Sequence, residues 1–136
     1  MTVSVKTRID GRWVSVAGAP SYEFMVETPF SFCVVDQTTI PQTVDSYLNV
    51  SKIEDSGGGK TKITFLLESE GDGYAVITQG DGAQDSSGWR IFPYVNQSDC
   101  FSTHLTVLNR PLSPNKAFQD SHRISVQVFS KGIKDA

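Results

Sequence analysis

The chain has 136 residues, 38% of them hydrophobic, and a formal net charge of −3. This length and apolar content predict one folded domain, residues 1–136, and exclude a disordered chain. Positive and negative residues are interspersed without a basic stripe, so nucleic acid is not an expected partner. No apolar run approaches the ~20 residues that cross a bilayer, so membrane insertion is not expected.

The N-terminal residues 1–9 alternate polar and apolar types and lack the apolar stretch of a signal peptide. Two interpretations stay open: a cytosolic protein, or an exported protein whose leader has been replaced by Met1. The surface role inferred below favours the second, with an extracellular or cell-surface location.

An Asp10-Gly11 turn predicts a β-hairpin at the start of the chain. Two-residue Asp-Gly loops favour a type I′ turn, which joins antiparallel strands directly. The turn sets Ile9 opposite Arg12 and Thr7 opposite Val14. The apolar residues that then share one face of the hairpin are Val3, Val5, Ile9, Val14 and Val16.

Short apolar or alternating segments, separated by Gly, Pro and Asp turn signals, predict about nine strands in all. After the hairpin they are expected at residues 22–26, 30–35, 47–53, 61–68, 74–78, 89–95, 101–107 and 124–128. The continuous apolar run at 30–35 is expected to be buried on both sides. Because no capped segment has a 3.6-residue apolar period, no helix longer than two turns is expected. The predicted fold is all-β, an immunoglobulin-like antiparallel sandwich of about 8–9 strands.

Cys33 and Cys100 lie in strand-like segments and do not form a Cys-x-x-Cys motif. Two states are open: a disulfide across the core, or two buried thiols.

The segment Ser56-Gly57-Gly58-Gly59-Lys60-Thr61 resembles a phosphate-binding loop. That loop requires a first glycine where this chain has Glu54, and a helix where this chain continues as a strand. The segment therefore predicts a glycine-rich hairpin turn.

No cofactor, metal site or catalytic residue is expected. The carboxylates of the glycine-rich loops do not have a calcium-loop spacing, so solvated turn residues are favoured over a calcium site. The two histidines and two cysteines do not have the spacing of a zinc site, and no Gly-x-Ser-x-Gly nucleophile motif occurs. The carboxylates and histidines considered are Glu70, Asp72, Asp81, Asp85, His104 and His122.

The segment Trp89-Arg90-Ile91-Phe92-Pro93-Tyr94 is the candidate binding site. If Trp89 and Ile91 point inward, then Arg90, Phe92 and Tyr94 point outward, where they could stack on a sugar ring or anchor a partner protein. The alternative is that both faces of this strand are buried. Pro93 predicts an edge strand, to which a partner could add a strand. Trp13 is a further candidate for the same surface.

The C-terminal residues 112–128 carry an aromatic, an aspartate two residues later and then alternating β-branched residues: Phe118, Asp120, Ile124, Val126 and Val128. This order resembles the closing strand of chaperone–usher pilus (fimbrial) subunits. The resemblance implies an incomplete immunoglobulin-like sandwich, completed by the N-terminal extension of a neighbouring subunit, and a role in adhesion. The alternating N-terminus resembles such an extension.

The sequence therefore favours a non-enzymatic surface or virion-type assembly subunit that acts through protein–protein contacts, including strand addition. The alternative is a carbohydrate- or ligand-binding β-sandwich module that uses Trp13, Arg90, Phe92 and Tyr94.

Overall fold

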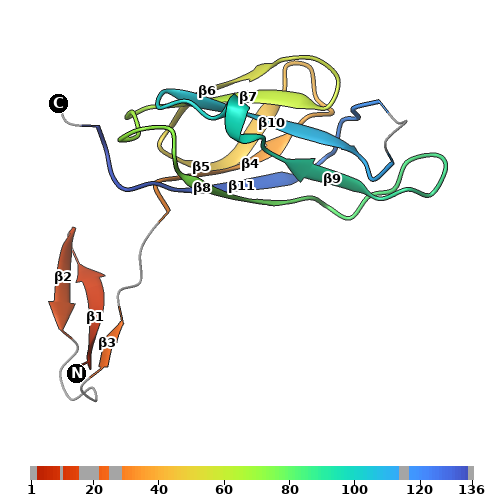
Figure 1. Ribbon diagram of the computed structural model, residues 1–136. Coiled ribbons are helices and arrows are strands. Elements are labelled where there is room, and N and C mark those ends of the chain that lie inside the picture. The colour runs from red at the N-terminus through yellow and green to blue at the C-terminus, as the bar shows by residue number, and fades with distance from the viewer. Residues whose placement is uncertain (1–2, 10, 16–21, 25–28, 114–116, 135–136) are drawn as a thin grey trace.

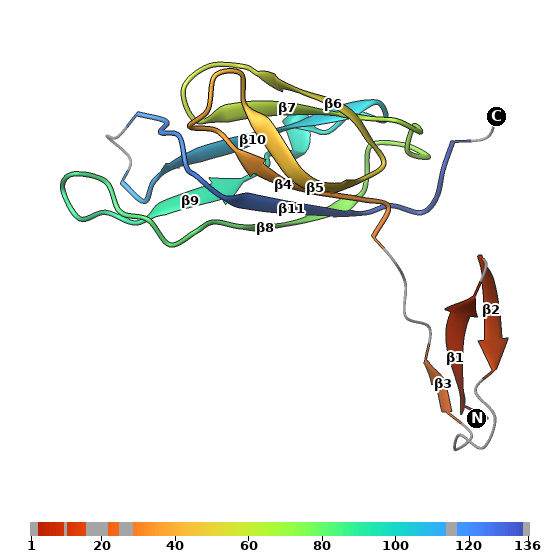
Figure 2. The same cartoon turned by 180° about the vertical axis from the view of Figure 1, so that it is seen from behind.

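The computed structural model describes residues 3–9, 11–15, 22–24, 29–113 and 117–134, and Figures 1 and 2 show the fold from two sides. The strands are β1 (Val3–Ile9), β2 (Arg12–Ser15), β3 (Tyr22–Phe24), β4 (Ser31–Asp36), β5 (Thr43–Leu48), β6 (Val50–Asp55), β7 (Lys60–Phe65), β8 (Ala75–Gln79), β9 (Ile91–Tyr94), β10 (His104–Pro111) and β11 (Ile124–Phe129). A three-residue 3-10 turn, η1 (Gln97–Asp99), is the helical element of the described residues, in agreement with the expected absence of long helices.

The N-terminal strands form a sheet of their own, in the order β2-β1-β3. The antiparallel register confirms the predicted hairpin, because Ile9 pairs with Arg12 and Thr7 pairs with Val14. Strand β3 lies parallel to β1 on its other side. Within the described residues, the strand pairs do not link this sheet to the other two. The predicted positions of Asp10 and Val16 lie outside the described residues.

The remaining strands form two four-stranded antiparallel sheets, β6-β7-β10-β9 and β5-β4-β11-β8. The sheets lie face to face as two layers (Figure 1), and the side chains between them make the core. The predicted all-β sandwich is thereby confirmed. The core residues are Cys33, Val35, Val50, Ile63, Phe65, Tyr74, Cys100, Leu105, Val107, Ile124, Val126 and Val128.

Aromatic side chains fill one part of this core. The Phe65 ring packs edge-on against Phe30, with 5.1 Å between centroids, and against Tyr74 at 5.8 Å. The Tyr74 hydroxyl donates a hydrogen bond to the carbonyl of Phe101 at 2.9 Å, so its burial leaves no orphaned polar group. Burial of each large apolar side chain contributes about 1.5–3 kcal/mol.

The structure corrects three strand predictions. The run at 30–35 is not buried on both sides: in β4 buried residues alternate with the half-buried Phe32 and Val34, because one sheet layer covers only one face. The predicted strand 47–53 is two strands, interrupted at Asn49 (φ 53°), where the chain crosses between sheets. Strand β10 begins at His104 and continues through Pro111, beyond the predicted strand end at residue 107.

None of the helical structure in the described part of the chain is long and apolar enough to cross a bilayer.

Candidate functional site

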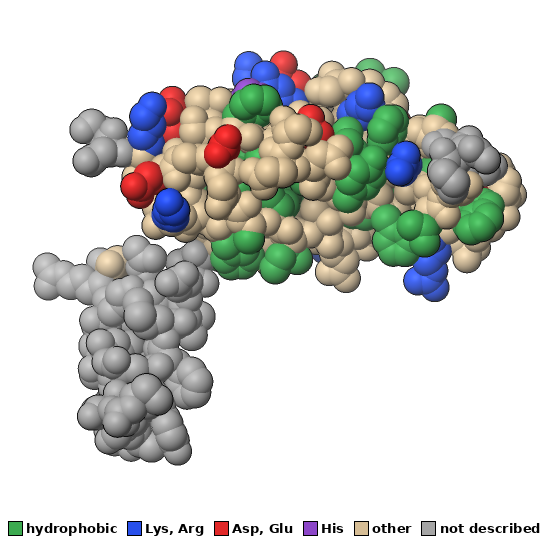
Figure 3. Space-filling model, in the orientation of Figure 1, with side chains coloured by type: hydrophobic (Ala, Val, Ile, Leu, Met, Phe, Trp, Pro, Cys, Tyr) green, Lys and Arg blue, Asp and Glu red, His purple; other side chains and the backbone are tan. Residues whose placement is uncertain are grey.

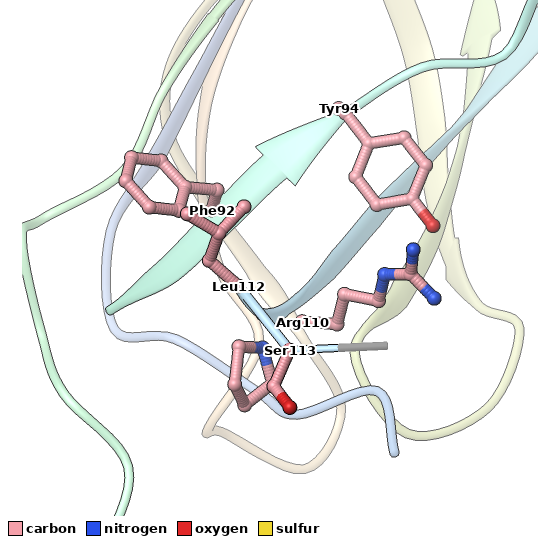
Figure 4. Close-up of a pocket in the computed structure, with 6 residues that line it drawn as sticks. Phe92, Tyr94, Arg110, Leu112 and Ser113 are labelled. Atoms are coloured by element: carbon pink, nitrogen blue, oxygen red, sulfur yellow. The ribbon is translucent and has the colours of Figure 1, made fainter. Parts of the chain in front are cut away.

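A hollow of about 450 Å³ lies on the outer face of the sheet β6-β7-β10-β9, where β9 runs beside the end of β10 (Figure 4). Its lining is mostly apolar and contains one cationic side chain. We call it the β9–β10 hollow, and its lining residues are Phe92, Tyr94, Arg110, Pro111, Leu112 and Ser113.

Strand alternation sets the outward direction of the ring side chains. Ile91 and Pro93 are buried in the sandwich, so the residues between and after them face out, and Phe92 is 44% exposed. The structure thereby decides between the two sequence-based alternatives, because the outer face of β9 is open. Trp89, expected to point inward, is instead 48% exposed in the loop before β9.

Arg110 is the cation of the hollow. Its guanidinium carbon lies 5.5 Å from the Tyr94 ring centroid and 6.0 Å from that of Phe118. The Lys60 ammonium lies 4.5 Å from the same Phe118 ring. Such cation–π contacts contribute about 0.5–1 kcal/mol at exposed sites. Among the described residues, neither cation forms an ion pair with a carboxylate.

Phe118 is held in place by backbone hydrogen bonds of the segment that carries it. The Gln119 amide donates to the Asn109 carbonyl at 2.9 Å, and the Asn109 side-chain amide donates to the Gln119 carbonyl at 2.8 Å. The Asp120 carboxylate accepts the Gly59 amide at 2.7 Å. Phe118 and Asp120, which belong to the C-terminal motif described above, thus contact Lys60 and Gly59 and hold the segment before β11 beside the β6–β7 turn.

A buried polar cluster lies under this end of the sheet. Gln37 donates to the Thr61 hydroxyl at 3.0 Å, and that hydroxyl donates to Gln42 at 2.6 Å. Asn109 donates to the Ser121 hydroxyl at 2.8 Å. These buried hydrogen bonds hold the backbone that carries Arg110 and the hollow in one arrangement, while the side-chain oxygen of Asn109 has no hydrogen-bond partner among the described residues.

Cations gather on the outer face of this sheet, and Lys and Arg side chains lie among hydrophobic ones there (Figure 3). Alternation in β7 and β10 turns Lys60, Lys62 and Arg110 outward, and Lys52 joins them from β6. The outward carboxylate of β6 is Glu54, which pairs with Lys52 at 3.1 Å. These cations come from three strands that are separated in sequence, which is why the sequence did not predict this patch.

Two predicted site residues lie elsewhere. Arg90 lines a second hollow, of about 400 Å³, together with residues 78–82 and the inner residues of β9; Phe92 borders both hollows. Trp13 belongs to β2 of the N-terminal sheet, paired with Arg8, and its side chain lies outside the described part of the structure. Sequence reasoning missed Arg110 and Leu112, which could have been found only from the pairing of β10 with β9.

The predicted edge position of β9 is confirmed, since β9 is the last strand of its sheet. However, the backbone groups of β9 that point away from β10 already have hydrogen-bond partners. The Ile91 amide donates to the Ala83 carbonyl at 3.0 Å, and the Pro93 carbonyl accepts the Thr78 hydroxyl at 2.9 Å. Because proline also has no amide hydrogen, a further strand would find few partners here.

Cys33 and Cys100 are both buried free thiols, which is the second of the two alternatives. Burial raises the pKa of Cys33 to about 12 and also raises the pKa of Cys100. Both thiols are therefore protonated and poorly nucleophilic at neutral pH.

His104 stacks on Phe101, with 4.6 Å between ring centroids. Burial lowers its pKa, and the neighbouring Lys62 adds to this effect. In the described ranges, His, Cys, Asp and Glu side chains form no group of three or more that could hold a metal ion.

Comparisons of this chain with protein-family models, curated proteins and solved structures found no match, so its function has to be inferred from the geometry of the site.

Proposed function

We propose that this chain is a non-enzymatic assembly subunit that binds other proteins through the face around the β9–β10 hollow. The single observation that carries the proposal is the composition of that hollow: exposed Phe92 and Leu112, the half-buried Tyr94 ring and the cationic Arg110 converge on one open depression. Large apolar side chains mixed with Tyr and Arg are the residue types that supply most of the binding energy in protein interfaces.

The charges of this face specify the chemistry of the partner. On the described strands β6, β7 and β10, four outward cations stand against the outward carboxylate of Glu54, and Asp120 adds a carboxylate beside the β6–β7 turn. A partner segment that places an apolar side chain in the hollow and carboxylates beside it would complement both properties. The described lining residues offer cationic, aromatic, apolar and hydroxyl groups, but no carboxylate, imidazole or thiol that could activate the Ser113 hydroxyl, which supports binding over catalysis.

We infer an immunoglobulin-like class for the sandwich from its strand order. Strands β6 to β11 follow, in chain order, the places A to F of that fold: β6-β7-β10-β9 has the order A-B-E-D, and β11 and β8 are paired as F and C. The place beside F, which belongs to the last strand G, is occupied by β4 from the N-terminal side of the same chain.

This strand order favours assembly by side-chain docking over assembly by strand donation. Strand β11, which carries the pilus-like motif residues Ile124, Val126 and Val128, is paired on one side with β4 and on the other with β8. A neighbour's strand would have to displace one of them. The open face of the sheet, in contrast, is accessible without any rearrangement.

The test is selection of a displayed random-peptide library on the wild-type protein, with counter-selection against Leu112→Asp. Leu112 is 67% exposed, so this substitution leaves the fold intact. It places a negative charge in the hollow, which repels the carboxylates expected in the partner. We expect peptides that combine a large apolar residue with Asp or Glu. Tyr94→Ala should lower the affinity for a selected synthetic peptide by about tenfold or more, as measured by fluorescence anisotropy.

The matched control is Ile77→Ser, an exposed residue on the outer face of the other sheet, which should leave peptide affinity unchanged. Peptides that bind wild type and Leu112→Asp equally well would contradict the proposal.

A carbohydrate-binding role is the second candidate, and the outward rings of Phe92 and Tyr94 on one strand favour it, because sugar rings pack on aromatic faces. A glycan array probed with wild type and Tyr94→Ala separates the two functions. Glycans bound by wild type and lost in Tyr94→Ala, together with a failed peptide selection, would replace the protein-binding proposal by this one.

A further inference from the structure

The opposite end of β7 carries a surface whose chemistry is the complement of the β9–β10 hollow. Directly after β7, Leu66 is 67% exposed and Leu67 is 49% exposed. The same turn continues with Glu68, Glu70 and Asp72, all exposed. We call residues 66–72 the acidic turn. It combines the apolar side chains and the carboxylates that the hollow and its cations would select.

The acidic turn is held in a fixed shape by its neighbours. The Leu67 amide donates to the Asn49 side-chain oxygen at 2.7 Å, and the Asn49 amide donates back to the Leu67 carbonyl at 3.2 Å. The Glu70 amide donates to the Gly132 carbonyl at 2.9 Å. A surface that is ordered before it binds loses little conformational entropy on docking, so exposed leucines presented in this way are suited to recognition.

One molecule cannot bring the two surfaces together. Lys60, at the start of β7, is linked through Leu108 to Tyr94 of the hollow, whereas Leu66 follows the end of the same strand. The six residues of β7 span about 20 Å at ~3.3 Å per residue. Figure 1 shows the turn after β7 and strand β9 toward opposite ends of the sandwich.

We infer that the partner is a second copy of this chain, docked head to tail, with the acidic turn of one copy in the β9–β10 hollow of the next. The inference rests on the proposed function and identifies its partner. Leu66 or Leu67 enters the depression beside Tyr94, and the exposed carboxylates of Glu70 and Asp72 face Arg110 and the lysines of β7. Glu68 is already paired with Lys134 at 3.3 Å.

The contact joins two different surfaces and is therefore heterologous. A docked pair keeps one free hollow and one free acidic turn, so association continues into an open filament or closes into a ring. The net charge of −3 does not prevent this, because the cations are gathered on the face that meets the acidic turn. Salt should weaken the contact by screening its charges.

The experiment is sedimentation velocity on the full chain over a wide concentration range, with two variants. Leu66→Ser/Leu67→Ser removes the docking side chains, and Leu112→Asp blocks binding in the hollow by placing a negative charge there. Circular dichroism checks that both variants are folded. We expect concentration-dependent association of wild type, loss of association in each variant alone, and formation of a one-to-one dimer when the two variants are mixed. The mixed dimer is expected because each variant retains the surface that the other has lost.

Ile77→Ser serves as the control and should associate like wild type, since it changes an exposed apolar residue outside both surfaces. Three results would overturn the inference: a wild type that stays monomeric, association unaffected by the variants, or folded variants that do not form the mixed dimer. If peptides are still selected by the hollow while wild type is monomeric, the proposed function stands and only the identity of the partner is wrong.

Discussion

Among the described glycines, Gly59 is the one at which an added Cβ would come closest to neighbouring backbone atoms. It has a φ of +64°, and a Cβ there would collide with the Asn109 carbonyl and the Gln119 backbone. Its amide donates to Asp120, and its carbonyl accepts the Asn109 amide. The glycine-rich segment that resembles a phosphate loop is therefore a structural junction, where the β6–β7 turn, β10 and the segment before β11 meet.

Gly59→Ala should lower the free energy of unfolding by about 3 kcal/mol, from left-handed backbone strain together with the steric collision. Gly71→Ala is the matched control, because Gly71 has a φ of +85° but no atom near its Cβ position. It should cost only the backbone strain, about 1 kcal/mol. Urea denaturation of both variants measures the difference. An equal loss of unfolding free energy in the two variants would show that the close approach of backbone atoms around Gly59 adds nothing to the cost of the substitution.

At the scale of elements, the crossing from β5 to β6 explains how one chain supplies edge strands to both sheets. Asn49 adopts a left-handed φ of 53°, which Asn tolerates better than most residues, and the chain changes sheets there. Its side chain forms two hydrogen bonds with the Leu67 backbone and so links the crossing to the acidic turn. Periodicity could not locate this break, because apolar and polar residues continue to alternate across it.

Two substitutions at Asn49 separate its backbone role from its side-chain role. Asn49→Gly keeps the positive φ but loses both hydrogen bonds to Leu67, at a cost of about 1–2 kcal/mol. Asn49→Ala loses the same bonds and adds left-handed strain of about 1 kcal/mol. The urea concentration at the midpoint of unfolding should be highest for wild type, lower for Asn49→Gly and lowest for Asn49→Ala. A stability of the Ala variant equal to that of the Gly variant would contradict the backbone role.

At the scale of the whole molecule, the two four-stranded sheets contain a complete core of their own. Every residue of the described core cluster lies between Cys33 and Val128, and both sheets contribute to it. The N-terminal strands β1 to β3 pair with one another. Since burial of apolar area is the main source of stability, the sandwich should not depend on the N-terminal sheet.

A chain that starts at residue 29 should therefore unfold in urea with a free energy within about 1 kcal/mol of the full-length value, a small part of the 5–15 kcal/mol of typical domains. The slope of the transition should also change little, because it reports the surface exposed on unfolding. Loss of the cooperative transition in the shortened chain would show that residues before 29 complete the core.

The sequence by itself determined the local features of this protein. Period-two alternation predicted most strands, Asp10-Gly11 predicted the register of the N-terminal hairpin, and Pro93 predicted an edge position for β9. These predictions succeed because turn chemistry and side-chain alternation act between residues that are close in sequence.

Only the tertiary structure decided how the candidate site is composed. Arg110 joins Phe92 and Tyr94 because β10 pairs with β9, and Phe118 joins them because its neighbour Gln119 is hydrogen-bonded to Asn109. The cationic face arises because three strands turn alternate residues to one side. Pairing between strands distant in sequence depends on burial of a shared core, and no local pattern encodes which strand becomes the neighbour of another.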